Sequence, residues 1–113
     1  MALAEHCYRL TSRFPKSEQF GLTAQLRRAV VSIASNIAEG HARRTRPSYL
    51  HHLNVALGSQ AELETQIELA VRLRFVREEE AAATLEAGAR VGRLLHGLIR
   101  ALEQKPQPPA PKP

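Results

Sequence analysis

The sequence contains no tryptophan and no aspartate, it has a single cysteine, and only 4% of its residues are aromatic. The lone Cys7 excludes a disulfide framework and a cysteine-based metal site within one chain. With so few aromatic residues, the core must be built from Leu, Ala, Ile and Val, which suits helix-on-helix packing better than a β-sandwich. Because all the acidic residues are glutamate, the surface also favours helix, and we expect an all-α protein.

The sequence also shows neither a transmembrane segment nor an export signal. No apolar run approaches the length that a transmembrane helix needs. The first residues lack the charged and apolar regions of a signal peptide. At 113 residues the chain is long enough for one domain with one core. We therefore expect a single cytoplasmic domain that makes no membrane contact.

Positive charge is concentrated in the first half of the sequence. Residues 1–61 contain eight Lys and Arg against three Glu, whereas residues 62–113 contain eight of each, so the first half carries the whole formal charge of +5. Such asymmetry is an argument about binding partners. It points to nucleic acid or to an acidic protein surface.

Apolar residues recur with helical spacing in four segments, which predicts helices at residues 2–13, 22–38, 46–73 and 78–103. Thr45 is the expected N-cap of the third helix, with Pro47 in its first turn. Gly40 is the expected stop of the second helix. The first helix is expected to turn four residues inward: Leu3, Cys7, Tyr8 and Leu10.

Short connections make consecutive helices antiparallel neighbours. The sequence therefore predicts an up-down-up-down four-helix bundle over residues 1–103. Residues 104–113 are rich in proline, which cannot continue a helix, and are expected to form a disordered tail.

A line of polar residues runs beside the apolar stripe of the second predicted helix and consists of Arg28, Ser32, Asn36 and Glu39. A helix that is apolar on one side and polar along its flank is expected to pack on two sides. This pattern favours a scaffold or an assembly over an enzyme.

The antiparallel pairing of the second and third helices can be registered approximately. If Gly40 faces Ser48, then Asn36 lies near His52 and Ser32 near Ala56. In the same register Arg28 lies near residues 60–64. Gly58 is then expected to allow close backbone approach, and Arg27 or Arg28 to form a partly buried ion pair with Glu62 or Glu64.

A basic cluster precedes the third helix and comprises Arg43, Arg44 and Arg46, with His41 nearby. Backbone donors and the positive end of the helix dipole attract anions there, so a phosphate group is a sensible ligand. Arg27 and Lys16 are expected to extend the basic patch. The competing interpretation is a solvated basic loop that serves solubility.

No catalytic residues, metal ligands or cofactor-binding residues emerge from the sequence. His51 and His52 are adjacent on a helix, so their side chains diverge by roughly 100° and do not easily share a metal ion. The glutamates 62, 64 and 68 lack the paired Glu-x-x-His helices of di-iron bundles. The serines lack a nucleophile elbow, and no phosphate-cradling glycine loop is present. We therefore expect a non-enzymatic protein without a cofactor.

Three motifs occur in order along the chain: FPKSExFGLTxQLRRA at residues 14–29, SIxxNIAEG at residues 32–40, and AxGSxxELETQ at residues 56–66. In these motifs the chain resembles the four-helix-bundle proteins of the 23S rRNA intervening-sequence family. The match is strong over residues 14–76, and the fourth helix matches by pattern.

The resemblance implies a bacterial cytosolic bundle that assembles as a ring of five. Relatives include accessory proteins of diversity-generating retroelements, which form a pentameric barrel and bind a reverse transcriptase and nucleic acid. Three interpretations follow. The chain is an oligomeric scaffold that binds RNA or DNA, an adaptor whose arginines meet an acidic partner such as a reverse transcriptase, or a purely structural oligomer.

Overall fold

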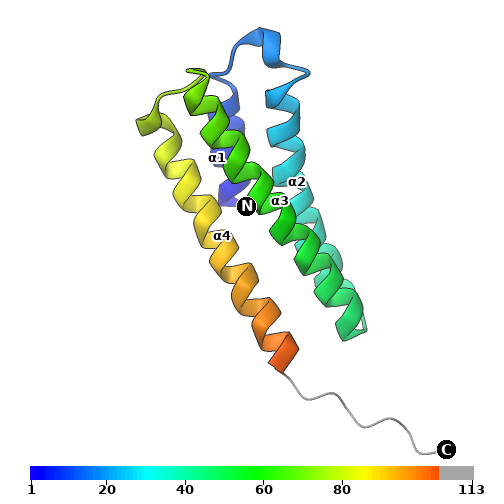
Figure 1. Cartoon of the computed structure of the whole chain (residues 1–113). Helices are drawn as coiled ribbons and strands as arrows, with labels where there is room; N and C mark the ends of the chain where they lie inside the picture. The colour runs from blue at the N-terminus through cyan, green and yellow to red at the C-terminus, as the bar shows by residue number, and fades with distance from the viewer. Residues whose placement is uncertain (105–113) are drawn as a thin grey trace, which may run out of the picture.

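The computed structural model describes residues 1–104 and is built of helices joined by short turns (Figure 1). The elements are α1 (Ala2–Thr11), a short 3₁₀ helix (Lys16–Glu18), α2 (Leu22–Ala42), α3 (Arg46–Arg72) and α4 (Glu78–Gln104). Residues 1–104 contain four α-helices and no strand, so the predicted all-α class is confirmed. None of these helices is long and apolar enough to cross a membrane. Of the predicted tail, all but Gln104 lies outside the described residues.

The helix ends show why α3 and α4 begin where they do. The Thr45 side chain accepts a hydrogen bond from the backbone N–H of Ser48 at 3.3 Å, and Pro47 lies in the first turn, so the predicted N-cap of α3 is confirmed. At the start of α4, Glu80 accepts the backbone N–H of Arg77 at 2.8 Å. This bond, together with nearby guanidinium groups, lowers the pKa of Glu80.

The end of α2 differs from the prediction. The helix continues through Gly40 to Ala42, and Gly40 is buried against α3. A Cβ atom built on Gly40 would lie 3.1 Å from His52 Cβ and 3.1 Å from Tyr49 Cδ1. Gly40 is therefore a point of close approach between two helices. The prediction that it stops α2 is wrong, because helix packing and not chain reversal is what requires a glycine there.

Replacing Gly40 with alanine is expected to destabilise the fold, although alanine favours helix by about 1 kcal/mol. The added methyl group would press on the His52 Cβ atom, which cannot move without shifting α3. We expect a net loss of about 1–2 kcal/mol in the free energy of unfolding. Urea unfolding checks this. The control is Ser35→Ala at an exposed position of the same helix, which should change stability by no more than about 0.5 kcal/mol. A stabilised Gly40→Ala protein would contradict the close packing.

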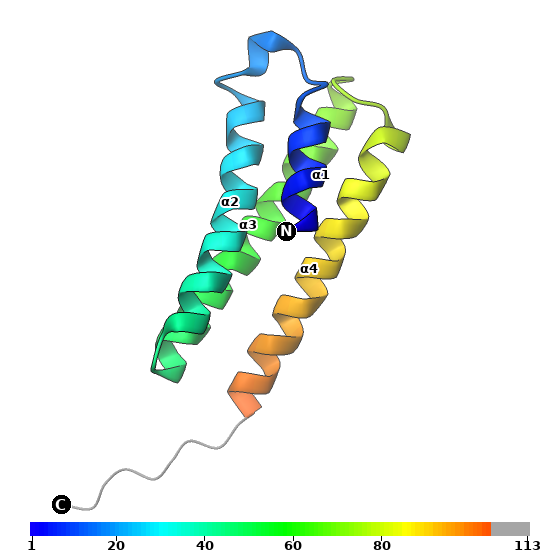
Figure 2. The same cartoon turned by 180° about the vertical axis from the view of Figure 1, so that it is seen from behind.

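The main core is formed where α1 lies between α2 and α4 (Figure 2). Leu3, Cys7 and Leu10 of α1 are buried there, as predicted. Tyr8 is 44% exposed, so its predicted inward position is wrong. The Arg27 guanidinium carbon lies 4.6 Å from the centre of the Tyr8 ring, and this cation–π contact holds the tyrosine against the outside of α2.

The length of α1 divides the bundle into two unequal parts. α1 has 10 residues, whereas α3 and α4 have 27 each. A second group of buried residues contains Leu53 and Ala56 of α3 with Leu95 and Ile99 of α4, and α1 contributes nothing to it. In Figure 2, the N-terminal end of α1 lies near the middle of the molecule, and α2, α3 and α4 extend beyond it. The end of the bundle that carries the α2–α3 turn is therefore three helices thick.

Candidate functional site

The basic cluster predicted from the sequence as a phosphate site lies at the turn that joins α2 to α3. We call His41, Arg43, Arg44 and Arg46 the basic turn. His41, Arg43 and Arg44 are exposed, and Arg46 is partly buried at the first position of α3. The local sequence causes this arrangement, because α2 ends at Ala42 and α3 begins at Arg46, which leaves only three residues between the two helices.

The charges of the basic turn remain accessible. Arg43 forms an ion pair with Glu39 one helical turn earlier at 3.0 Å, and about half of each side chain is exposed. An exposed ion pair of this kind contributes about 0.2–1 kcal/mol to stability. It therefore does not prevent Arg43 from binding an anion that binds more tightly than Glu39 does. His41 packs edge-on to the Tyr49 ring, with 6.4 Å between the ring centres. The turn is thus held in shape while the side chains of Arg43 and Arg44 are exposed to solvent.

Backbone donors contribute less to an anion site here than the sequence indicated. Of the first amides of α3, the Ser48 N–H is bound by Thr45, and Pro47 has none. The Tyr49 N–H is bound by the Thr45 carbonyl oxygen. An anion at this helix end would therefore interact mainly with guanidinium groups.

The structure does not bring all the predicted basic residues together. Lys16 lies on the 3₁₀ helix before α2, at the opposite end of the molecule from the basic turn. Arg27 and Arg43 are 16 positions apart along α2, which is about 24 Å of helix. Arg27 is also partly buried, and it donates a hydrogen bond to Thr11 Oγ1 at 2.8 Å. The prediction that Lys16 and Arg27 extend the patch is wrong, because α2 carries them away from it.

The polar line on α2 meets α3 in a connected set of hydrogen bonds. Ser32 Oγ lies 2.9 Å from Ser59 Oγ, and the Asn36 amide donates to the Ser32 carbonyl oxygen at 2.9 Å. His52 Nδ1 lies 3.0 Å from Asn36 Oδ1. Because an amide oxygen only accepts, this contact requires an N–H at His52 Nδ1. The predicted contact of Asn36 with His52 is confirmed, whereas Ser32 pairs with Ser59, three residues beyond the predicted Ala56.

Arg28 lines a polar cleft between α2 and α3 with a volume of about 410 Å³, whose opposite wall includes Glu62 and Gln66. Within residues 1–104 neither Arg28 nor Glu62 forms an ion pair, and Glu64 accepts a hydrogen bond from Gln60 at 2.7 Å instead. The predicted buried pair between Arg27 or Arg28 and Glu62 or Glu64 is therefore wrong for a single copy of the chain.

Gln66 gives the same cleft an unsatisfied acceptor. Its Oε1 atom is buried and has no hydrogen-bond partner. A buried acceptor without a donor costs about 1–3 kcal/mol. Beside this cleft, the single chain therefore leaves one buried acceptor without a hydrogen-bond donor.

The predicted role of Gly58 is wrong. The residue is exposed, and a Cβ atom built on it would meet nothing within 4 Å. The close approach of α2 to α3 occurs at Gly40 instead, because Gly58 faces away from α2.

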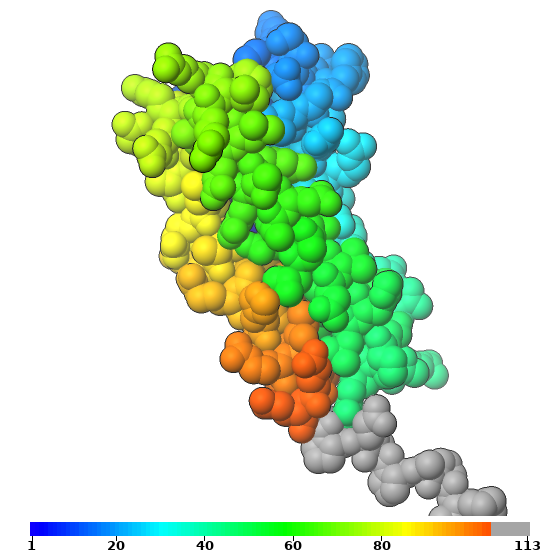
Figure 3. Space-filling model, in the orientation of Figure 1, coloured from blue at the N-terminus to red at the C-terminus, as the bar shows by residue number. Residues whose placement is uncertain are grey.

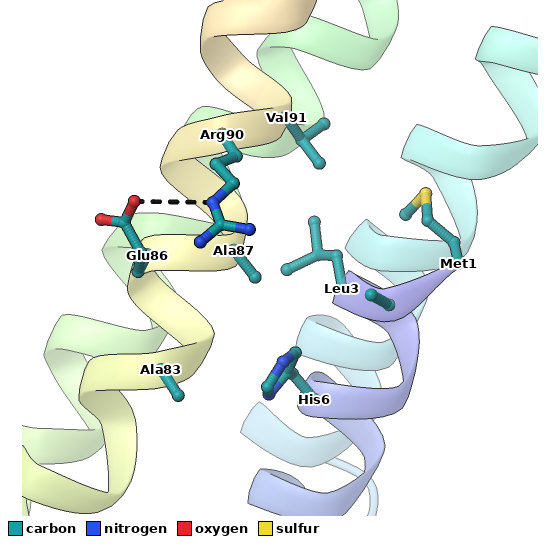
Figure 4. A pocket seen from close by; sticks show the side chains of 9 residues that line it. Met1, Leu3, His6, Ala83, Glu86, Ala87, Arg90 and Val91 are labelled. Carbon is teal, nitrogen blue, oxygen red and sulfur yellow. Dashed lines mark ion pairs between the residues drawn. The ribbon is translucent and has the colours of Figure 1, made fainter.

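A second cleft lies between the start of α1 and the middle of α4, with a volume of about 350 Å³ (Figure 4). The side chains of Ala83, Ala87 and Val91 point from α4 toward α1. Arg90 forms an ion pair with Glu86 at 3.7 Å at the rim. The lining is mostly apolar, so this cleft offers packing surface and few groups that could orient a polar ligand.

Sequence reasoning missed the buried polar contact between α3 and α4. Gln60 is 6% exposed, and its amide donates to the carbonyl oxygen of Gly88 at 3.1 Å as well as to Glu64. A Cβ atom on Gly92 would lie 3.1 Å from the same amide, so this glycine makes room for it. The available signal was the pair of glycines spaced four residues apart on α4, opposite a glutamine in an otherwise apolar stripe.

Reactive and metal-binding chemistry has little support among residues 1–104. No three His, Cys or Glu side chains in this part of the chain lie together in a way that would hold a metal ion. Burial raises the pKa of the Cys7 thiol to about 12, so at neutral pH it stays protonated and is a poor nucleophile.

Residues 1–104 thus form an all-α fold of four helices with a basic turn between α2 and α3. Residues 1–97 match the family model described as 23S rRNA-intervening sequence protein. This chain belongs to that family.

The solved structures similar to the chain in fold include a protein of unknown function from the S23 ribosomal protein family of Bacteroides thetaiotaomicron VPI-5482. The two share 24% sequence identity with a TM-score of 0.81, over 88% of this chain and 93% of that one. Comparison with curated proteins gives no match.

Proposed function

We propose that this protein is a non-enzymatic, oligomeric scaffold that binds RNA or another nucleic acid through the basic turn. In this proposal the chain is an up-down-up-down bundle that assembles into a ring-shaped homo-oligomer. The family resemblance implies five copies in the ring. The observation that carries the proposal is the clustering of Arg43 and Arg44, on the three-residue turn between two long helices, with Arg46 at the first position of α3. The name of the family, which refers to an intervening sequence of 23S rRNA, supports a nucleic-acid partner.

The chemistry of the basic turn favours recognition of phosphate over recognition of bases. Guanidinium groups bind phosphate oxygens with two parallel hydrogen bonds. Tyr49, the aromatic ring beside the turn, is partly buried and packed against His41, so it is a poor platform for base stacking. Binding should therefore depend on backbone charge and shape more than on sequence. A ring repeats the turn on every subunit, which multiplies a weak contact into useful avidity.

A protein adaptor is the second candidate function. The ion pair between Arg43 and Glu39 shows that a carboxylate can approach the basic turn. An acidic protein surface, such as that of a reverse transcriptase, would use the same guanidinium groups as RNA would. The resemblance to retroelement accessory proteins favours this alternative, and a reverse transcriptase gene beside the gene for this chain would support it.

The salt dependence of RNA binding tests the proposal. With three phosphate contacts per subunit on single-stranded RNA, raising the salt from 50 to 200 mM should weaken binding by roughly twentyfold per subunit engaged. Retention of random-sequence RNA on the immobilised protein is the measurement, and native mass spectrometry gives the subunit number in parallel. If 50 mM salt already abolishes retention, nucleic acid is not the partner. If native mass spectrometry finds only the monomer, the proposal of an oligomeric scaffold is refuted.

A further inference from the structure

α3 presents two stripes of residues with the 3–4 spacing of a packed helix, and only one of them faces the bundle. The inward stripe contains residues such as Leu53, Leu63 and Ile67, all fully buried. The second, which we call the outer α3 stripe, is exposed along its whole length and consists of Val55, Gly58, Glu62, Thr65 and Leu69 of α3 and the C-cap residue Leu73. Helices with apolar residues on two faces are typical of elements that pack on two sides.

The apolar members of this stripe are large and open to solvent. Leu73 is 51% exposed, Leu69 is 43% exposed and Val55 is 38% exposed. In Figure 3 the surface of α3, drawn in green, lies at the front of the molecule between α4 and α2. Between these apolar residues, Glu62 has no ion pair within residues 1–104 and borders the polar cleft whose Gln66 oxygen is unsatisfied. A single copy thus leaves apolar area and the Glu62 side chain uncovered at one place.

α4 carries a second exposed stripe of matching period. We call Arg90, Leu94, Gly97 and Ala101 the outer α4 stripe, which repeats at intervals of four, three and four residues. Leu94 is 59% exposed. Arg90 lies within the stripe and pairs with Glu86 at 3.7 Å, whereas Arg100, which borders the stripe, forms no ion pair among the described residues. A stripe with cationic groups is complementary to one with an unpaired glutamate.

Each stripe also contains a glycine for which the single chain gives no reason. A Cβ atom on Gly58 or on Gly97 would meet nothing within 4 Å, and both residues lie inside 27-residue helices. An exposed glycine in a helix costs about 1 kcal/mol relative to alanine. Close approach by the backbone of another helix is a use that offsets this cost.

We propose that the outer α3 stripe of one copy packs against the outer α4 stripe of a second copy, with Gly58 and Gly97 at the points of closest approach. The inference rests on the proposed function, because it presumes that the chain self-associates. Two different surfaces meet in this contact, so each copy uses one stripe for each neighbour. Such a head-to-tail contact generates a ring when the rotation closes.

Two lysine substitutions test the pairing without disturbing the fold. Gly58→Lys and Gly97→Lys each place a long cation in open space on a helix and should preserve the helical circular dichroism signal. In native mass spectrometry each variant alone should shift from the assembled mass to the 12.5 kDa monomer. Ala82→Lys adds the same charge to exposed α4 surface outside both stripes and should assemble like the unchanged protein.

Mixing the two variants distinguishes this pairing from other contacts. Each variant keeps the stripe that the other has lost, so an equal mixture should form a one-to-one dimer and nothing larger. If both lysine variants assemble like the unchanged protein, the pairing is overturned while the oligomer stands. A mixture that stays monomeric, although each variant alone lost assembly, would also overturn it. An unchanged protein that is itself monomeric would remove the proposed scaffold together with this contact.

Discussion

Replacing Arg43, Arg44 and Arg46 together with alanine is expected to weaken RNA binding by about 10²- to 10³-fold at 50 mM salt, at each subunit that contacts the RNA. Each guanidinium that neutralises a phosphate releases a condensed counterion, and for a single strand each lost contact lowers the slope of log K against log salt by about 0.7. The variant should therefore also show a salt dependence shallower by about two. Fluorescence anisotropy at several salt concentrations gives both quantities.

The matched control removes the same charge from the other end of the molecule, through alanine at Arg9, Lys16 and Arg72 together. All three are exposed. Since they lie far from the basic turn, RNA affinity should change by no more than about threefold at 0.15 M salt, where the screening length is about 8 Å. If the control weakens binding as much as the first variant does, net charge and not the turn governs the contact.

Replacing Leu63 with alanine is expected to lower the free energy of unfolding by about 2.7–5 kcal/mol, which is the range for leucine truncation in a buried site. Leu63 is fully buried in α3 and lies opposite Gly88 of α4, where a Cβ atom would be 3.6 Å from Leu63 Cδ2 and 4.0 Å from Leu3 Cδ1. It therefore fills the space where α1, α3 and α4 meet. Because small domains are stable by only about 5–15 kcal/mol, this one change removes a large part of the total.

Urea unfolding at fixed protein concentration measures the effect of Leu63→Ala. Phe20→Ala serves as the control, because Phe20 is 89% exposed and its loss should change stability by no more than about 0.5 kcal/mol. Equal destabilisation by the two changes would mean that Leu63 does not join three helices.

Helix positions followed from the sequence because their signals are local. Apolar spacing predicted the four helices, and the threonine and proline at positions 45 and 47 predicted the start of α3, since a cap depends on residues a few positions apart. Asn36 was matched with His52 by counting back from a short antiparallel turn, which needs little more than the helical rise. Errors grew with distance from that turn, as the offset of Ser32 by three residues shows.

The glycines and charged side chains could not be predicted in the same way. Gly40 and Gly58 both lie inside helices, yet the rotation of each helix buries the first against Tyr49 and exposes the second. Arg27 and Arg28 are adjacent, but their side chains point about 100° apart, so Arg27 reaches α1 while Arg28 faces the outer cleft. For the candidate site, sequence alone therefore located the basic turn and misplaced two of its proposed members.

The brevity of α1 has a consequence for motion. Residues near the α2–α3 turn pack on a small cluster of side chains from three helices. At the other end of the bundle, four helices contribute to the core. Local opening needs least free energy where the fewest apolar contacts must break. Amide protons near the arginines should accordingly exchange with deuterium sooner than those beside Cys7. The end of the molecule that carries the basic turn is therefore also the end that opens most easily. A bound polyanion should slow amide hydrogen exchange there.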